Sequence, residues 1–187
     1  MLLQLKRTSN SFIVKTTIIN ALETDIDEIF RLYDLATKHQ ISINAIAIWP
    51  NFDRHSILQE IKEKRQWKLM IDNQIACIWA TAYSDPDIWE ERNNDAAVYI
   101  HRIATNPYFR GNQFVLKIVE WAKSHAKHLH KQFIRLDTVG NNIGLIQYYQ
   151  QTGFTYLGQF KLKNTENLYG HYKKDAVCLF EINLIRF

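Results

Sequence analysis

The chain has 187 residues, of which 47% are hydrophobic and 22% are charged, and its formal net charge is +4. This length and composition allow a buried core without disulfides or metals and exclude dominant disorder. The charge excess is small, so we expect neither a nucleic acid nor a membrane as partner. We expect a single domain spanning residues 1–187.

The two cysteines and the apolar segments bear on location. Cys77 and Cys178 lie in apolar, strand-like surroundings, which favours buried reduced thiols over a disulfide framework. No apolar run approaches the roughly 20 residues of a membrane span, and the start lacks a secretory signal pattern. We therefore expect a cytoplasmic protein.

The first half of the chain predicts one strand, two helices and a hairpin. Residues 12–20 are β-branched and predict a strand, and residues 25–38 carry apolar side chains at helical spacing. Thr24 is the expected cap of that helix, and a second, short helix is expected near residues 56–64. Residues 67–83 form two apolar runs joined at Asp72 and Asn73, a pair that favours a turn.

The second half alternates strands and helices after a polar stretch at residues 84–95. Strands are expected at residues 96–105 and 133–138, and a helix with one apolar stripe at residues 112–130. A further helix at residues 142–151 ends before Gly153, which is placed to adopt positive φ. Strands at 154–162 and 176–184 close the chain. This order predicts an α/β protein with a mixed sheet of about seven strands and flanking helices.

The segment at residues 98–122 runs from a strand through a turn into a helix. Pro107 ends the strand, and Arg110, Gly111 and Asn112 lead into the helix. A helix N-terminus presents unpaired N–H groups that attract phosphate, and Gly111 lets a ligand approach the backbone. The pattern predicts an anion site.

This segment resembles the acetyl-CoA motif of the GNAT acetyltransferases. A second stretch, residues 136–154, resembles that family's other signature, with Asn142, Tyr149, Gly153 and Phe154 at matching spacing. The two motifs lie in the family's order, and the resemblance covers nearly the whole chain. It implies a GNAT-like fold and an enzyme that transfers an acetyl group from acetyl-CoA to a primary amine of a small molecule or peptide.

The resemblance also implies which residues bind acetyl-CoA. The pantetheine arm would lie along a strand that splays from its neighbour, and the pyrophosphate would lie on the turn. The implied binding residues are Ile103, Ala104, Thr105, Arg110, Gly111, Asn112, Gln113, Phe114, Val115 and Asn142. Gln113 and Val115 stand where the family has glycines, and we expect their Cβ atoms to hold φ negative. This departure leaves open a non-catalytic CoA-binding regulatory module.

Two residues are the catalytic candidates. Tyr149 matches the family's usual acid and would donate a proton to the CoA thiolate, although it also fits a core aromatic. His101 is the candidate base because an unperturbed histidine pKa near 6.5 suits proton removal at neutral pH. In a regular strand His101 shares a face with Ile103. Glu90 and Glu91 are the reserve candidates.

Several features leave the acceptor and the partners open. The acidic stretch could attract a cationic amine or be a solvated loop tip; it holds Asp85, Asp87, Glu90, Glu91 and Asp95. Aromatic residues could line an acceptor pocket or fill the core; they are Trp49, Phe52, Trp79 and Trp89. A basic face suits a polyanionic ligand or solvent; it comprises Lys117, Lys123, Lys127, His128, His130, Lys131 and Arg135. His125, His128 and His130 lack metal-ligand spacing, so we expect no metal. The sequence leaves open whether the protein forms a homodimer.

Overall fold

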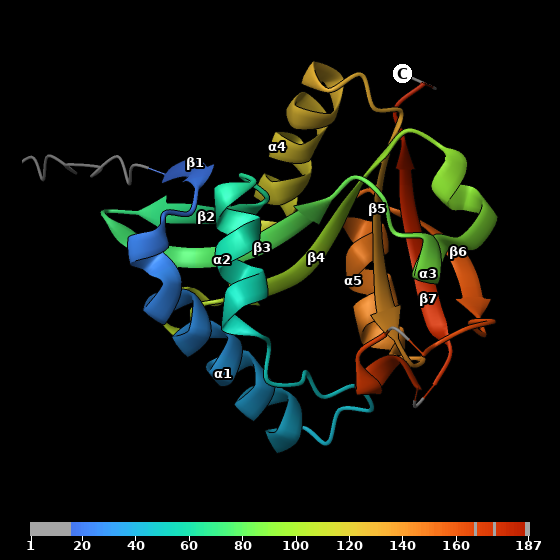
Figure 1. Ribbon diagram of the computed structural model, residues 1–187, viewed down its shortest axis with the longest axis horizontal. Coiled ribbons are helices and arrows are strands. Elements are labelled where there is room, and N and C mark those ends of the chain that lie inside the picture. The colour runs from blue at the N-terminus through green and yellow to red at the C-terminus, as the bar shows by residue number, and fades with distance from the viewer. Residues whose placement is uncertain (1–15, 167, 174, 186–187) are drawn as a thin grey trace, which may run out of the picture.

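A seven-stranded mixed sheet forms the centre of the described chain (Figure 1). The computed structural model describes residues 16–166, 168–173 and 175–185. The strand order is β1-β2-β3-β4-β5-β7-β6, and only β4 and β5 pair in parallel. The strands are β1 Thr16–Asn20, β2 Gln66–Ile71, β3 Gln74–Ala82, β4 Ala97–Thr105, β5 Phe133–Val139, β6 Thr155–Phe160 and β7 Val177–Asn183.

Helices cover both faces of this sheet (Figure 1). The α-helices are α1 Ile26–Ser42, α2 Arg54–Lys62, α3 Pro86–Trp89, α4 Phe114–His128 and α5 Ile143–Gln151. Short 3-10 segments are η1 Glu23–Asp25, η2 Glu90–Asn94, η3 Pro107–Phe109 and η4 Gly170–Lys173. Helices α1 and α2 bury one apolar stripe each against the β2–β4 side, and α4 lies on the opposite face. The predicted fold class and order of elements are confirmed.

Local sequence explains most element boundaries. Asp72 and Asn73 both adopt positive φ, as a tight two-residue hairpin turn requires. Gly153 has φ +100 after α5, as predicted. The expected Thr24 cap is wrong, since Thr24 lies inside η1 and α1 has no side-chain cap. Asp25 instead accepts bonds from the Leu22 N–H and from buried Lys68. Residues 12–15 of the first expected strand lie outside the described residues.

Strands β4 and β5 separate halfway along their length. Their parallel pairing runs from Ala97 and Phe133 only to Tyr99 and Arg135. Beyond Tyr99, β4 continues to pair with β3 up to Thr105, while β5 pairs with β7. Among the described strands, none pairs with the β5-facing edge of β4 beyond Tyr99. The two strands therefore form a fork whose backbone groups can bind a ligand.

A β-bulge in β4 lies at this fork. Arg102 has φ +52, and the register against β3 shifts between Ile78 and Ala80. The bulge places His101 and Arg102 on the same face of the sheet, whereas Ile103 packs into the core beside α4. The expectation that His101 shares a face with Ile103 is therefore wrong, because an extra residue inverts the alternation.

Some residues that the sequence analysis placed in a basic face or a possible acceptor pocket are buried in the core. Trp79 is 0% exposed and packs on Trp121 of α4, while Trp89 packs against Tyr99. These two tryptophans therefore fill the core and do not line an acceptor pocket. Arg135 is also buried, so it is not part of the basic face; its guanidinium bonds to Asp95 and Glu181.

Cys77 and Cys178 are buried free thiols, as expected. Among the described helices, none is both long enough and apolar enough to cross a membrane.

Candidate active site

The turn between β4 and α4 presents an open backbone. Asn106 accepts a bond from the Tyr108 N–H and starts η3, after which Arg110 and Asn112 are exposed. Gly111 has φ +84, and a Cβ atom there would meet nothing within 4 Å. The helix N-terminus that follows leaves N–H groups without intrahelical partners, so the turn can hold an anion.

Gln113 keeps the backbone shape that a glycine would have at this turn. It is the N-cap of α4 and adopts φ +50 and ψ +43, the left-handed conformation. The expectation that its Cβ would hold φ negative is therefore wrong. Left-handed backbone costs an L-residue about 1–2 kcal/mol, which the packing of Phe114 and Val115 in the core offsets.

Tyr149 extends from α5 into the core behind the fork. Its ring packs against Phe180 and Phe154, with centroids 5.2 and 6.0 Å away. Burial raises the pKa of Tyr149 above its ordinary value, and the nearby groups of Tyr148 and Asp137 raise it further. The phenol therefore keeps its proton at neutral pH and lies close enough to Asp137 to sense its charge.

Asn142, expected at the pantetheine, caps α5. Its side-chain oxygen accepts a bond from the Leu145 N–H at 3.0 Å. A capping bond of this kind fixes where the helix begins, and it uses the oxygen rather than the amide NH₂ group. The NH₂ group of Asn142 stays available to a ligand carbonyl.

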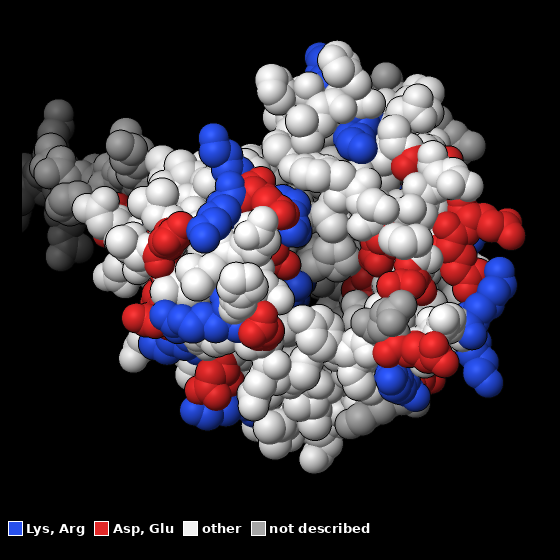
Figure 2. Space-filling view, in the orientation of Figure 1, with Lys and Arg blue, Asp and Glu red and all other residues white. Residues whose placement is uncertain are grey.

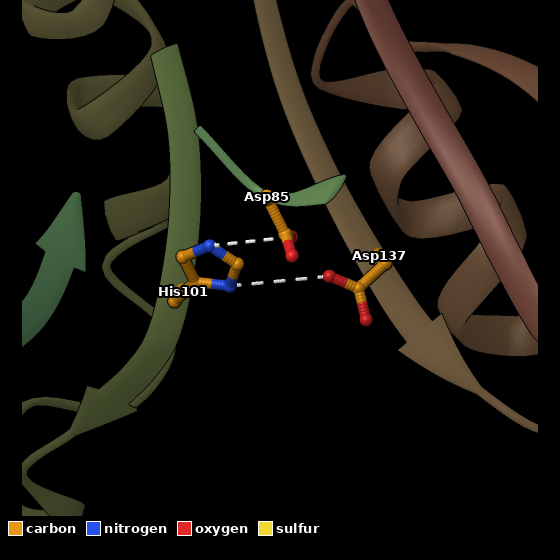
Figure 3. Close-up of side chains that lie close together, drawn as sticks. All are labelled: Asp85, His101 and Asp137. Carbon is orange, nitrogen blue, oxygen red and sulfur yellow. Dashed lines mark ion pairs between the residues drawn. The ribbon is translucent and has the colours of Figure 1, made fainter. Parts of the chain in front are cut away.

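His101 faces two carboxylates, those of Asp85 and Asp137, across the fork (Figure 3). Its Nε2 is 3.7 Å from Oδ2 of Asp85, and its Nδ1 is 3.9 Å from Oδ1 of Asp137. The three residues come from β4, β5 and the loop before α3. Their side chains are 21%, 13% and 3% exposed for His101, Asp85 and Asp137 respectively. We call this set the fork cluster.

Neighbouring residues hold both carboxylates in place. The Tyr172 hydroxyl donates to Oδ2 of Asp137 at 2.9 Å. The Asp85 N–H donates to the side chain of Asn93, which also accepts a bond from the Tyr99 hydroxyl. Oδ2 of Asp85 is buried and has no hydrogen-bond partner among the described residues. The cluster is thus fixed in position but incompletely satisfied.

Burial lowers the pKa of the imidazole in the fork cluster and raises the pKa of both carboxyls. Burial, with the positive charges of Arg102 and Arg65, lowers the pKa of His101 to about 3. Burial, with the negative charges of Asp137 and Asp87, raises the pKa of Asp85 to about 7. Burial also raises the pKa of Asp137 to about 6, although the Tyr172 hydrogen bond opposes this rise. The pKa of His101 thus lies well below the unperturbed value near 6.5 expected from the sequence, and its imidazole is neutral at neutral pH.

One face of the molecule is hollowed. Figure 2 shows a hollow near the centre of this face, between the half covered by α1 and α2 and the half built from β5 to β7. On the first half, Arg102 donates to Glu60 of α2 and to the Tyr33 hydroxyl of α1. Figure 2 also shows acidic side chains gathered on the second half.

Aromatic side chains meet at one end of the described face. Phe52 packs against Trp49 and Tyr169, with ring centroids 5.8 and 5.5 Å away. Phe52 belongs to the segment between α1 and α2, and Tyr169 precedes η4, so this contact joins the two halves of the molecule. Tyr169 is 41% exposed and is therefore accessible to a ligand.

Other candidates lie away from the fork cluster. Glu90 pairs with Lys163 at 2.8 Å, and hydrogen bonding to Lys163 lowers the pKa of Glu90. That pair makes Glu90 a poor base. His125 bonds to the Tyr83 hydroxyl at 2.9 Å and stacks on Trp121. Within the described residues, the fork cluster is the only set of three groups spaced to hold a metal ion.

Sequence reasoning did not single out Asp137, and it placed Asp85 only within an acidic stretch. One signal was present for Asp137: it is an acidic residue near the carboxyl end of a strand that carries the apolar Ile134 and Leu136. The pairing of Asp137 with His101 depends on the relative position of β4 and β5, which no local pattern reports.

Comparisons with known proteins agree with this geometry. Residues 70–154 match the family model described as the acetyltransferase (GNAT) family. A curated relative, the uncharacterized N-acetyltransferase YesJ of Bacillus subtilis (strain 168), is 24% identical over 110 residues. That alignment covers 57% of this chain and 61% of the relative, so the chain spans less than two thirds of its length.

Solved structures share the fold. A GNAT-family acetyltransferase from Listeria monocytogenes 4b F2365 superposes with a TM-score of 0.74 at 23% identity, covering 91% of this chain and 96% of the other. The putative acetyltransferase YncA of Salmonella typhimurium, solved with its cofactor acetyl-CoA, gives 0.65 at 15% identity, covering 91% and 94%. At these identities the likeness establishes the fold.

Proposed function

We propose that the protein transfers the acetyl group of acetyl-CoA to a primary amine of a small molecule or peptide, because residues 70–154 match the model of the GNAT acetyltransferase family. The observation that carries the proposal is the β4–β5 fork, which has an open anion-binding turn at one side and the fork cluster at the other. Reaction between two bound partners requires such a shared centre.

The residues present fit acetyl-CoA. The open turn at residues 110–115 offers a cation at Arg110, free N–H groups and a glycine with empty space beside it. The unpaired edge of β4, which includes Ile103, Ala104 and Thr105, offers backbone groups to an amide-containing arm. When bound, acetyl-CoA supplies an activated acetyl thioester; this chain's part is to hold and orient it.

Tyr149 and His101 take the two proton-transfer roles. Burial raises the pKa of Tyr149, so the phenol is protonated at neutral pH. It donates a hydrogen bond, and then its proton, to the departing thiolate as negative charge develops on the sulfur. His101 accepts the amine proton. Because burial lowers the pKa of His101 to about 3, the imidazole relays this proton and does not keep it. Asp85, whose pKa burial raises to about 7, is the group that holds the proton, and Asp85 and Asp137 both lie near the imidazole nitrogens.

A charge reversal on the turn tests the proposal. Arg110→Glu places a carboxylate where phosphate would lie, so we expect at least a tenfold loss of CoA affinity by calorimetry. Lys127→Glu is the matched control, because it reverses a charge in the last turn of the same helix, at the opposite end from the turn. Equal affinities for the Arg110→Glu and Lys127→Glu variants would reject the placement of CoA.

A non-catalytic CoA-binding module is the alternative. This alternative rests on Gln113 and Val115, which stand where the family has glycines. Gln113 adopts the left-handed backbone of a glycine, so only Val115 still supports the alternative. Tight CoA binding without acetylation of any amine would favour the module over the enzyme.

A further inference from the structure

Buried carboxylates in this protein are paired with cations, with two exceptions. Three of them, each less than one fifth exposed, bond to a lysine or arginine: Asp25 to Lys68, Glu60 to Arg102 and Glu181 to Arg135. Asp85 and Asp137 are equally or more buried, yet among the described residues their only ion-pair neighbour is His101. A buried charge without a partner is strongly unfavourable, so these two carboxylates call for a cation from outside the chain.

The nearest arginine does not supply that cation. Arg102 follows His101 directly, but its guanidinium is held by Glu60 and the Tyr33 hydroxyl and stacks over Phe52. The imidazole of His101 is neutral at neutral pH, since burial lowers its pKa to about 3. The two carboxylates that lack a paired cation therefore lie at the fork, where the acceptor amine must bind.

We infer that the fork cluster binds the acceptor as an ammonium ion, and that Asp85 and Asp137 select cationic amines that carry no carboxylate beside the amine. This inference rests on the proposed function and names the class of its acceptor. A primary alkyl ammonium has three N–H donors, which match the buried Oδ2 of Asp85, the Oδ1 of Asp137 and an imidazole nitrogen. A neighbouring carboxylate, as in a free amino acid, would face both aspartates and be repelled.

The same geometry gives a balanced proton path. The ammonium passes one proton through His101 to Asp85, which becomes a neutral acid while the amine becomes a nucleophile. The nitrogen then bonds to the thioester carbon and the carbon–sulfur bond breaks. The sulfur takes the proton of Tyr149, and Tyr149 recovers a proton from the acylated nitrogen. Asp85 finally loses its proton to water, so one proton is released per turnover.

The charged and titratable groups that face Asp85 come from four elements and one connecting segment. They are His101 and Tyr99 on β4, Asp137 on β5, Asp87 on α3, Tyr172 on η4 and, beyond His101, Arg102 on β4 and Arg65 in the segment before β2. The nearest of these, His101, is neutral at neutral pH, and Arg102 is already paired with Glu60. A bound ammonium therefore has no strong competitor at this position.

Three acceptor probes separate charge from shape in the full-length protein with saturating acetyl-CoA. Phenethylamine is a cation at neutral pH, phenylalanine adds a carboxylate beside the same amine, and aniline is neutral. We expect wild type to prefer phenethylamine over phenylalanine by at least tenfold in kcat/KM. Asp85→Asn should lower kcat/KM for phenethylamine about 100-fold and for aniline less than threefold, since aniline brings no proton to remove. Asp72→Asn, which neutralises an exposed carboxylate in the turn between β2 and β3, should change neither by more than twofold.

Binding is measured separately so that turnover is not the only readout. Calorimetry with CoA present should show phenethylamine binding to wild type and about tenfold weaker binding to Asp85→Asn and Asp137→Asn. An equal loss for phenethylamine and aniline, or unchanged phenethylamine binding in both variants, would overturn the inference. So would activity that disappears with a chelator and returns with a divalent metal, because the cation would then be a metal. Ammonium binding without turnover supports the inference and contradicts only the proposed function.

Discussion

The unpaired carboxylate of Asp85 should lower the stability of the folded protein. Its pKa is raised from 3.8 to about 7 in the fold, chiefly by burial. A folded-state pKa above the unfolded value means that the native state holds the proton more tightly, so stability falls as pH rises from about 4 to about 7. With 1.36 kcal/mol per pKa unit, the shift of roughly 3 units costs about 4 kcal/mol at pH 8.

Replacing Asp85 by Asn removes that cost while keeping the size of the side chain. We expect Asp85→Asn to raise the free energy of unfolding by about 2–4 kcal/mol at pH 8, with a gain that shrinks by about 2–3 kcal/mol at pH 5. In a chain of this length each kcal/mol moves Tm by about 2–4 °C. Relief of repulsion with Asp137 adds to the gain in the same direction.

Urea unfolding of both proteins at pH 5 and pH 8 measures the effect. Asp72→Asn is the matched control, since Asp72 is an exposed carboxylate in the turn between β2 and β3 and its replacement should change stability little. A gain that is the same at both pH values would mean that the charge of Asp85 is not its cause. A loss at pH 8 would show that Asp85 has a partner cation in solution and would refute the reasoning. A stable but inactive Asp85→Asn would be typical of a functional group kept at the expense of stability.

Two further predictions concern Tyr149 and Gln113. Tyr149→Phe should fold and bind CoA but lower turnover, measured as CoA release, by about 10²–10⁴-fold. A variant that melts at a lower temperature would show that the hydroxyl is structural. An unchanged rate would show that Tyr149 takes no part in the mechanism. Gln113→Gly should relieve left-handed strain of about 1 kcal/mol and raise Tm by about 2–4 °C, whereas Lys117→Gly, inside the same helix, should lower Tm by a similar amount. A lower Tm in both variants would show that Gln113 is not strained.

The sequence determined the elements and the two motifs, because these depend on short-range pattern. Apolar periodicity determined the order of strands and helices, and Asp72 and Asn73 determined a hairpin. The residues around Gly111 and Tyr149 carried the resemblance to the GNAT acetyltransferases, whose family model matches residues 70–154. The family match lies within residues 70–154, the part of the chain where such local signals are densest.

Tertiary structure alone decided the chemistry of the fork cluster. The bulge at Arg102 reversed the expected facing of Ile103, and it arises from strand pairing rather than from local preference. His101 meets Asp85 and Asp137 only because β4 and β5 part beyond Tyr99 and the loop before α3 folds over the gap. Burial then lowered the pKa of His101 and raised the pKa values of Asp85 and Asp137. Solvent exclusion is a property of the assembled fold, so no residue pattern could report it.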